Sequence, residues 1–275
     1  MGNGFLSILN NSAALKLLLV VLVLFVNGAV QVSAEEPHPY KATTADECIQ
    51  EKECVWEHFK LATKLSGQFK ADVSHRFSRW ERPIKISYTG PFSDEEKKVM
   101  GGLFSQIQPY FPLGVSVGQP YTVLFTKTES IEKELKSAPF LKLSSQIAGD
   151  PLSFYNSYKD SEELSKTCDY KKIFKSGFET DIYLFFSIIQ DDEEDFSGCF
   201  KRTLYGVTGL NNLNMLSPIV NDGSEFANLE LLILGLYYQP IFKSGMDLDQ
   251  IKETFDLVYE EYTRIFLVNM ENIND

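Results

Sequence analysis

Histidine is scarce in this chain: there are three among 275 residues, and all of them precede residue 76. A helix further along therefore cannot carry two histidines one turn apart, which is how many zinc sites begin. A serine or cysteine nucleophile would find no histidine base downstream, and no Gly-x-Ser-x-Gly motif is present. No phosphate-binding glycine loop is present either, since Gly101-Gly102 interrupts a predicted helix instead of opening one.

Basic residues and long apolar runs are also lacking. Lys and Arg number 26 against 38 Asp and Glu, for a net charge of −12, which repels nucleic acid and anionic lipid. The apolar run 14–26 is shorter than the roughly 20 residues that a membrane-spanning helix needs. Because Val32-Ser33-Ala34 then suits signal peptidase, residues 1–34 are predicted to be a signal peptide, with an uncleaved anchor as the alternative.

The expected mature protein is secreted or periplasmic, with no stable membrane anchor. Its charge would be −13, because residues 1–34 contain Lys16 and no acidic residue, leaving 25 basic against 38 acidic residues. Its length and its 44% apolar content suffice for a substantial core. No cofactor is predicted, and the partner is unknown, with a protein as one possibility.

Cysteine is rare but even in number, which in an exported chain favours two disulfides. Three pairings are possible. We expect Cys48 with Cys54, which closes a short loop, and Cys168 with Cys199. A metal site is disfavoured, because the Cys-x5-Cys spacing is wider than that of zinc knuckles and no histidine lies near the other two cysteines.

The domain organisation follows from periodicity. Residues 35–78 are predicted to be a leader and an N-terminal helix, whose apolar positions from Cys54 to Phe77 recur every three or four residues. Residues 79–275 are predicted to form the main domain. Its first elements are expected to be a strand over 82–90, a helix that begins at Ser93 and ends near Tyr110, and a second strand over 121–125.

The second half of the main domain is expected to be less regular at its start. The stretch 126–177 is polar and is predicted to be a long irregular insertion with one helix over 161–167. A nearly all-apolar strand, 181–189, is expected inside the sheet, followed by a solvated acidic loop over 191–195. Helices are then predicted near 199–212 and 225–238, and an amphipathic one from Leu248 onward. The fold class is α+β.

The stretch Cys199–Asn212 resembles the active-site helix of the metzincin metalloproteases in its place along the chain. That family carries His-Glu-x-x-His-x-x-Gly-x-x-His or Asp on the helix. With the glycine aligned to Gly209, the remaining positions of the motif fall on non-ligand residues: Arg202, Thr203, Gly206 and Asn212. The resemblance implies a zincin-like core with a mixed sheet, a degenerate active-site helix and added N- and C-terminal helices.

The chain also resembles an uncharacterised family of exported bacterial proteins, a domain of unknown function. The matching residues span the C-terminal half: Cys199, Gly209, Asn212, Tyr238, Pro240, Gly245 and Met246. Arg202 and Thr203 replace a pair of acids in that family's pattern, and Gly206 replaces a glutamine.

These resemblances predict a binding or interaction protein without metal. Arg202, Thr203, Gly206 and Asn212 are the candidate binding residues, and Gly209 has a structural role in ending the helix. Catalytic and metal residues are not expected. The alternative is a secreted hydrolase that uses carboxylates, and a third possibility is that the amphipathic terminal helices mediate oligomerisation.

Overall fold

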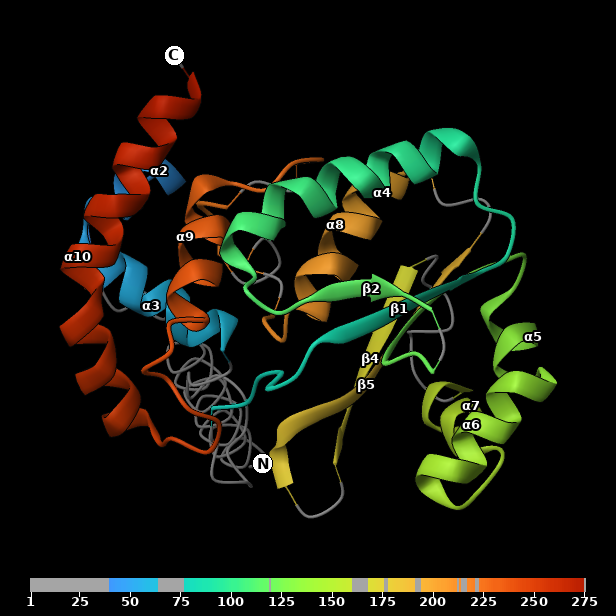
Figure 1. Ribbon diagram of the computed structural model, residues 1–275. Coiled ribbons are helices and arrows are strands. Elements are labelled where there is room, and N and C mark those ends of the chain that lie inside the picture. The colour runs from blue at the N-terminus through green and yellow to red at the C-terminus, as the bar shows by residue number, and fades with distance from the viewer. Residues whose placement is uncertain are drawn as a thin grey trace, which may run out of the picture. The chain divides into compact units, whose positions relative to one another are not determined.

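The computed structural model describes residues 40–63, 77–118, 120–159, 168–175, 178–190, 194–211, 213, 217–220 and 223–274. Tyr40–Asp275 forms one compact unit, in which helices lie on both faces of a five-stranded sheet (Figure 1). The predicted signal peptide lies outside the described residues. The prediction of a mixed α+β protein is confirmed.

The sheet has the strand order β2-β1-β3-β5-β4. Four strands are parallel: β1 (Ile84–Thr89), β2 (Val115–Val117), β3 (Val123–Thr128) and β5 (Phe178–Gln190). Strand β4 (Cys168–Lys175) pairs with β5 in the antiparallel direction and forms one edge. The predicted strands are therefore present, and β2, which was not predicted, forms the other edge.

Strand β5 is mostly apolar from Ile182 to Ile189 because both of its faces are covered there. Phe185 and Ile189 belong to the larger hydrophobic core, whereas Phe186 and Ile188 belong to a smaller core on the opposite face. Alternate side chains of a strand point to opposite faces, so a strand that lies between two helical layers carries no polar stripe.

Helix α4 (Asp94–Ile107) begins as its sequence predicts. The hydroxyl of Ser93 accepts from the backbone N–H of Glu96 at 3.2 Å, and the Glu96 carboxylate accepts from the Ser93 N–H at 2.7 Å. A short 3-10 helix, η1 (Gln108–Tyr110), follows and ends before Pro112. Glu96 also binds Lys127 of β3 at 2.9 Å, which fixes the start of α4 over the sheet.

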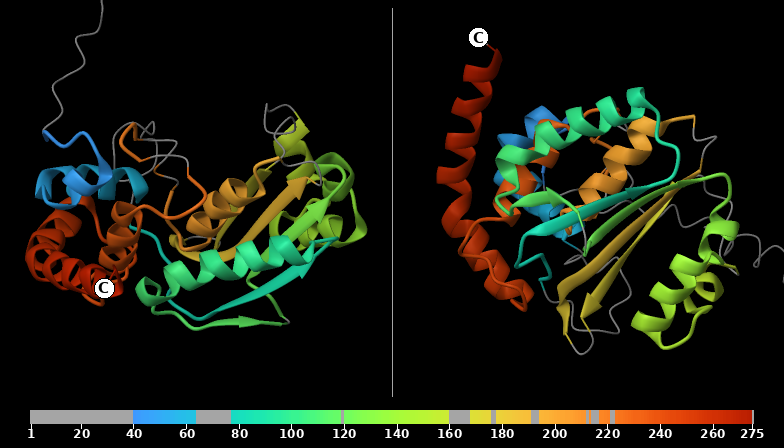
Figure 2. Two further views of the ribbon diagram at one scale, coloured as in Figure 1. Left: turned by 90° about the horizontal axis from the view of Figure 1, so that it is seen from above. Right: turned by 45° about the vertical axis from the view of Figure 1, so that its right-hand side comes forward.

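The prediction of an irregular insertion over 126–177 is wrong. This stretch contains α5 (Ile131–Leu135), α6 (Ala138–Ala148), α7 (Ser153–Lys159) and the edge strand β4. A few widely spaced apolar residues, among them Ile131, Leu135 and Phe140, are enough to hold the helices on the sheet (Figure 2). The helix predicted over 161–167 lies outside the described residues.

Helix α8 (Phe196–Val207) packs on the sheet, and the remaining helices pack on one another beside it. They are α2 (Ala45–Ile49), α3 (Lys52–Ala62), α9 (Asn228–Tyr237) and α10 (Leu248–Asn274). Of the helix predicted over 54–77, the described residues contain α3, which ends at Ala62. Phe77 is not helical, and its backbone forms hydrogen bonds with Gly245 and Met246. Two residues of the family resemblance thus hold the chain just before β1.

Candidate functional site

Helix α8 occupies the position of the predicted degenerate helix, directly after β5. The side chain of Asp195 caps it by accepting from the Gly198 N–H at 2.9 Å. Its first turns are joined to β4 by a disulfide between Cys199 and Cys168, with Cα atoms 5.9 Å apart. The second disulfide, Cys48–Cys54, connects α2 and α3. Both predicted pairings are confirmed.

The sheet-facing side of α8 is filled with side chains. Thr203 is fully buried, with its hydroxyl 3.5 Å from that of Ser187 and 3.8 Å from the Cys168 sulfur. A Cβ atom on Gly206 would lie 2.8 Å from Cζ of Tyr170 and 3.3 Å from the ring of Phe185. These two candidate binding residues therefore belong to the packing between helix and sheet.

Of the other two candidate residues, the structure describes one. Arg202 lies on the partly exposed side of α8, and its guanidinium is 3.8 Å from the Asp195 carboxylate. Asn212 lies outside the described residues. The described candidates thus do not converge on one cleft.

Three side chains from different parts of the chain donate hydrogen bonds to backbone carbonyls at the end of α8 and just after it. Trp80 Nε1 donates to the Val207 carbonyl at 2.6 Å, and the Tyr238 hydroxyl donates to the Thr208 carbonyl at 2.6 Å. The Lys172 ammonium donates to the next two carbonyls, those of Gly209 and Leu210, at 2.8 and 2.7 Å. The carbonyl of the last helical residue and those of the three residues that follow it are thereby satisfied by the protein itself.

Gly209 turns the chain directly after α8. Its φ is +100°, in the left-handed region that favours glycine. A Cβ atom there would lie 2.7 Å from the Tyr237 hydroxyl and 3.2 Å from Ile182. Both the backbone conformation and the space around it therefore require glycine.

A buried ion pair, which the sequence analysis missed, connects α8 to α9. Lys201 Nζ lies 2.9 Å from Oε2 of Glu230, and both side chains are almost fully buried. The same carboxylate oxygen accepts from the Ala227 N–H at 2.9 Å at the start of α9. The one sign of this pair in the sequence is Glu230, an acidic residue inside the otherwise apolar run of α9. Since the charges neutralise each other in the core, this carboxylate is not placed to act as a catalytic base.

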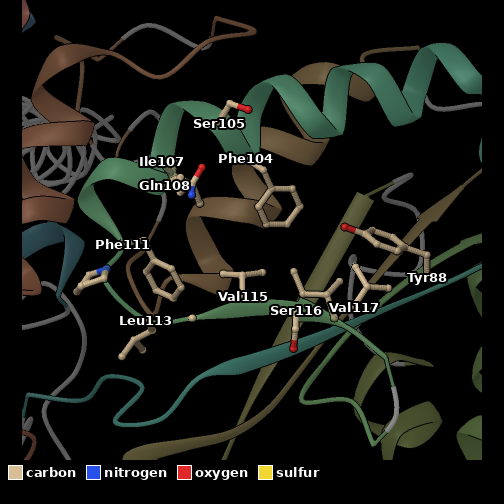
Figure 3. A pocket seen from close by; sticks show the side chains of 13 residues that line it. Tyr88, Phe104, Ser105, Ile107, Gln108, Phe111, Leu113, Val115, Ser116 and Val117 are labelled. Carbon is tan, nitrogen blue, oxygen red and sulfur yellow. The ribbon is translucent and has the colours of Figure 1, made fainter.

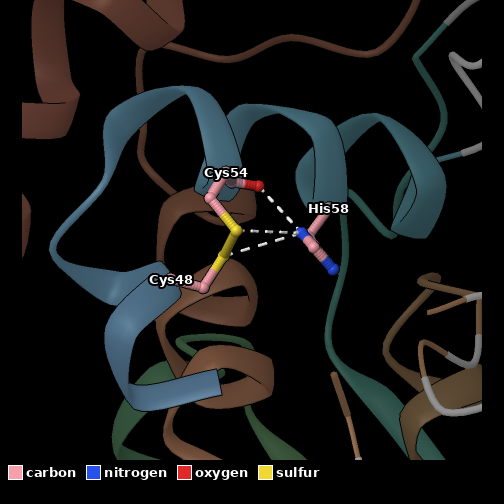
Figure 4. A group of neighbouring side chains, drawn as sticks. All are labelled: Cys48, Cys54 and His58. Atoms are coloured by element: carbon pink, nitrogen blue, oxygen red, sulfur yellow. Dashed lines mark hydrogen bonds between the residues drawn. A yellow bond between two sulfur atoms is a disulfide. The ribbon is translucent and has the colours of Figure 1, made fainter. Parts of the chain in front are cut away.

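His58 lies beside the Cys48–Cys54 disulfide (Figure 4). Its Nδ1 is 3.6 and 3.7 Å from the two sulfurs and 2.8 Å from the Cys54 carbonyl, while Nε2 is 2.6 Å from the Ser217 hydroxyl. These atoms have metal-ligand spacing, but the sulfurs are joined to each other and are not thiolates. A neutral ring that donates from Nδ1 and accepts from Ser217 satisfies both contacts, so this is a packed histidine.

An open hollow lies between α4, η1 and the edge strand β2. It measures about 720 Å³, and its walls include Phe104 and Phe111 above and Val115 and Val117 below (Figure 3). A second hollow of about 300 Å³ adjoins it, because both are lined by Tyr88 and Phe104. We call the two together the α4–β2 groove.

The groove is apolar and nearly uncharged. Among the described residues that line it, Lys97 at the smaller hollow is the one that carries a charge, and no carboxylate, histidine or cysteine is present. Burial raises the pKa of Tyr88 to about 12, so its hydroxyl stays neutral at any physiological pH. This surface can bind apolar groups and accept or donate neutral hydrogen bonds.

The α4–β2 groove is thus separate from the residues of α8 that the sequence singled out. No helix within the described residues is long and apolar enough to cross a membrane. Comparisons with known protein families, with curated proteins and with solved structures find no match to this chain.

Proposed function

We propose that this chain is an exported binding protein with a zincin-like core that has lost its metal site. The observation that carries the proposal is the filled face of α8: Thr203, at the position of the motif's glutamate, and Gly206, at the position of its second histidine, are buried against the sheet. A helix that follows an interior strand and ends at a left-handed glycine is the arrangement that the metzincin resemblance implies.

The contacts around α8 support a role as scaffold. The Cys168–Cys199 disulfide fixes its beginning, and the donors Trp80, Tyr238 and Lys172 fix its end. In a metalloprotease the bound ion and its ligands connect these parts of the fold. Here covalent and hydrogen-bonded links would hold the same elements without an ion.

The binding surface that we propose is the α4–β2 groove. It is open and largely apolar, and its walls include the exposed side chains of Val115 and Val117, unlike the buried sheet-facing residues of α8. A carboxylate hydrolase would require acids in the cleft, and the described lining contains none. Binding is therefore the better supported function.

Metal analysis of protein purified from the exported fraction tests the loss of the metal site. We expect zinc well below one ion per chain, no peptidase activity, and a mature N-terminus at Glu35. Stoichiometric zinc that a chelator removes together with an activity would overturn the proposal.

A further inference from the structure

Strand β2 has a free hydrogen-bonding edge. A hydrogen bond lies at each end of its ladder with β1. At one end the Ile84 N–H donates to the Gly114 carbonyl at 2.9 Å, and at the other the Gly118 N–H donates to the Ile86 carbonyl at 3.0 Å. In a parallel ladder alternate residues bond the same neighbour, so Ser116 faces β1. The N–H and C=O groups of Val115 and Val117 therefore point away from the sheet, and within the described residues they have no partner.

The side chains beside this edge are apolar and open to solvent. Val115 is 44% exposed and Val117 is 74% exposed, and both point into the α4–β2 groove, whereas Ser116 points away (Figure 3). A further strand laid along β2 would place every second side chain in the groove, against Phe104. Free backbone groups and an adjoining apolar groove together fit an extended peptide.

Helix α4 has a bare surface where it borders the groove. Gly101 lines the smaller hollow, and nothing lies within 4 Å of a Cβ atom built there. Glycine inside a helix is less favourable than alanine by about 1 kcal/mol, and no contact within the described chain requires it. A ligand passing close to the helix would require it.

We propose that the α4–β2 groove binds an extended peptide segment that adds to β2 as a new edge strand, with uncharged apolar side chains at alternate positions. The inference rests on the proposed binding function and specifies its ligand. Backbone hydrogen bonds would supply affinity, and the groove would select the side chains.

A second copy of this chain is the less favoured occupant. Two copies would bring together net charges of −12 each, which repel one another. The exposed strand is only three residues long, so pairing two such strands would bury little surface. A flexible peptide that continues past β2 along the groove avoids both difficulties.

Selection from a phage-displayed library of random linear peptides, on the full mature protein, supplies the probe. We expect enriched sequences to alternate apolar and variable residues and to lack charge at the apolar positions. Methylating the N–H groups of one alternate set of residues in such a peptide should weaken binding at least about tenfold. Methylating the other set should leave binding intact.

Two pairs of variants locate the site. Val117→Pro removes an outward N–H without breaking the ladder to β1, and Gly101→Leu fills the smaller hollow; each should weaken binding at least about tenfold. Val117→Thr keeps the N–H, and Gly102→Leu adds the same side chain one residue outside the lining. Both controls should bind like the wild type, and Gly101→Leu and Gly102→Leu should each melt no lower than the wild type.

The outcomes separate this inference from the proposed function. No enriched peptide, or binding that is unchanged in both Val117→Pro and Gly101→Leu, overturns strand addition at β2. If sedimentation shows a dimer and Val117→Pro dissociates it, the edge of β2 binds a second copy of the chain. That outcome also overturns the proposal of an added peptide strand. If a partner from the exported fraction still binds Gly101→Leu, the binding function stands while the groove assignment fails.

Discussion

At the scale of single residues, Lys201 and Glu230 form the most deeply buried ion pair in the described part of the chain. Both charges are almost completely removed from water, and they lie 2.9 Å apart between α8 and α9. A buried pair of this kind contributes little relative to an apolar pair of the same size, but each charge depends on the other.

Glu230→Gln should therefore destabilise the protein by about 3–5 kcal/mol, because Lys201 would be left buried without its counter-charge. Urea unfolding followed by circular dichroism measures the loss. Lys201→Met combined with Glu230→Leu should recover most of it. Lys252→Met, which breaks the exposed pair with Asp256, is the control and should cost less than about 1 kcal/mol.

Two glycines should respond to alanine in opposite directions. Gly206→Ala forces a Cβ atom against Tyr170 and should lower the free energy of unfolding by about 1–3 kcal/mol. Gly102→Ala places its methyl group in open space on α4 and should raise it by about 0.5–1 kcal/mol. Equal effects of the two substitutions would contradict the packing described for α8.

At the scale of elements, the start of α4 is held by a carboxylate whose ionisation matters. Partial burial acts to raise the pKa of Glu96, but hydrogen bonds from Lys127 and Ser93 outweigh it and hold the pKa below its ordinary value of 4.5. The ionised form therefore stabilises the fold.

The pKa of Glu96 is lower in the folded than in the unfolded protein. Its contribution to the free energy of unfolding is therefore complete at pH values above the range in which carboxyl groups ordinarily titrate. It should be lost as the pH falls below about 4.5 toward the folded pKa. The difference in free energy of unfolding between wild type and Glu96→Gln, measured at a series of pH values, should shrink over this window. A difference that grows on acidification would contradict the assignment.

The disulfides connect elements over unequal lengths of chain. Cys168 and Cys199 are 31 residues apart, whereas Cys48 and Cys54 are 6 apart. By loop-closure entropy, removing the longer link with Cys168→Ala and Cys199→Ala should cost about 3–4 kcal/mol, and removing the shorter one about 2 kcal/mol. Thermal unfolding of the two double variants compares these losses of stability. If removal of the Cys48–Cys54 link cost more, local packing and not loop length would determine how much each disulfide contributes.

At the scale of the whole molecule, the sequence predicted the elements that carry a strong local pattern. The capping box at Ser93 and the apolar run of β5 depend on neighbouring residues, whereas the even number of cysteines is a count over the chain. The structure agrees with all three. Strand β2 was missed because three residues are too few to show a period. Helices α5 to α7 were missed because their buried residues are sparse among polar ones.

The groove was beyond prediction for a different reason. Its walls come from α4, η1 and two strands, and its apolar residues look in sequence like ordinary core positions. Likewise, the filling of α8 depends on Tyr170, which lies in a stretch predicted to be irregular. Tertiary packing decides which apolar residues remain exposed, and a local sequence pattern does not contain that information.

The contact between Gly206 and Tyr170 bears on how such a protein can change over time. Replacing Gly206 with a larger ligand residue would collide with the Tyr170 ring, which stacks on Phe185 with ring centroids 5.2 Å apart. A metal ligand at position 206 would thus need a smaller side chain at position 170 before it or together with it. Each of these changes alone would lose stability, so single substitutions that each keep the fold stable would not build a metal site on this face of α8.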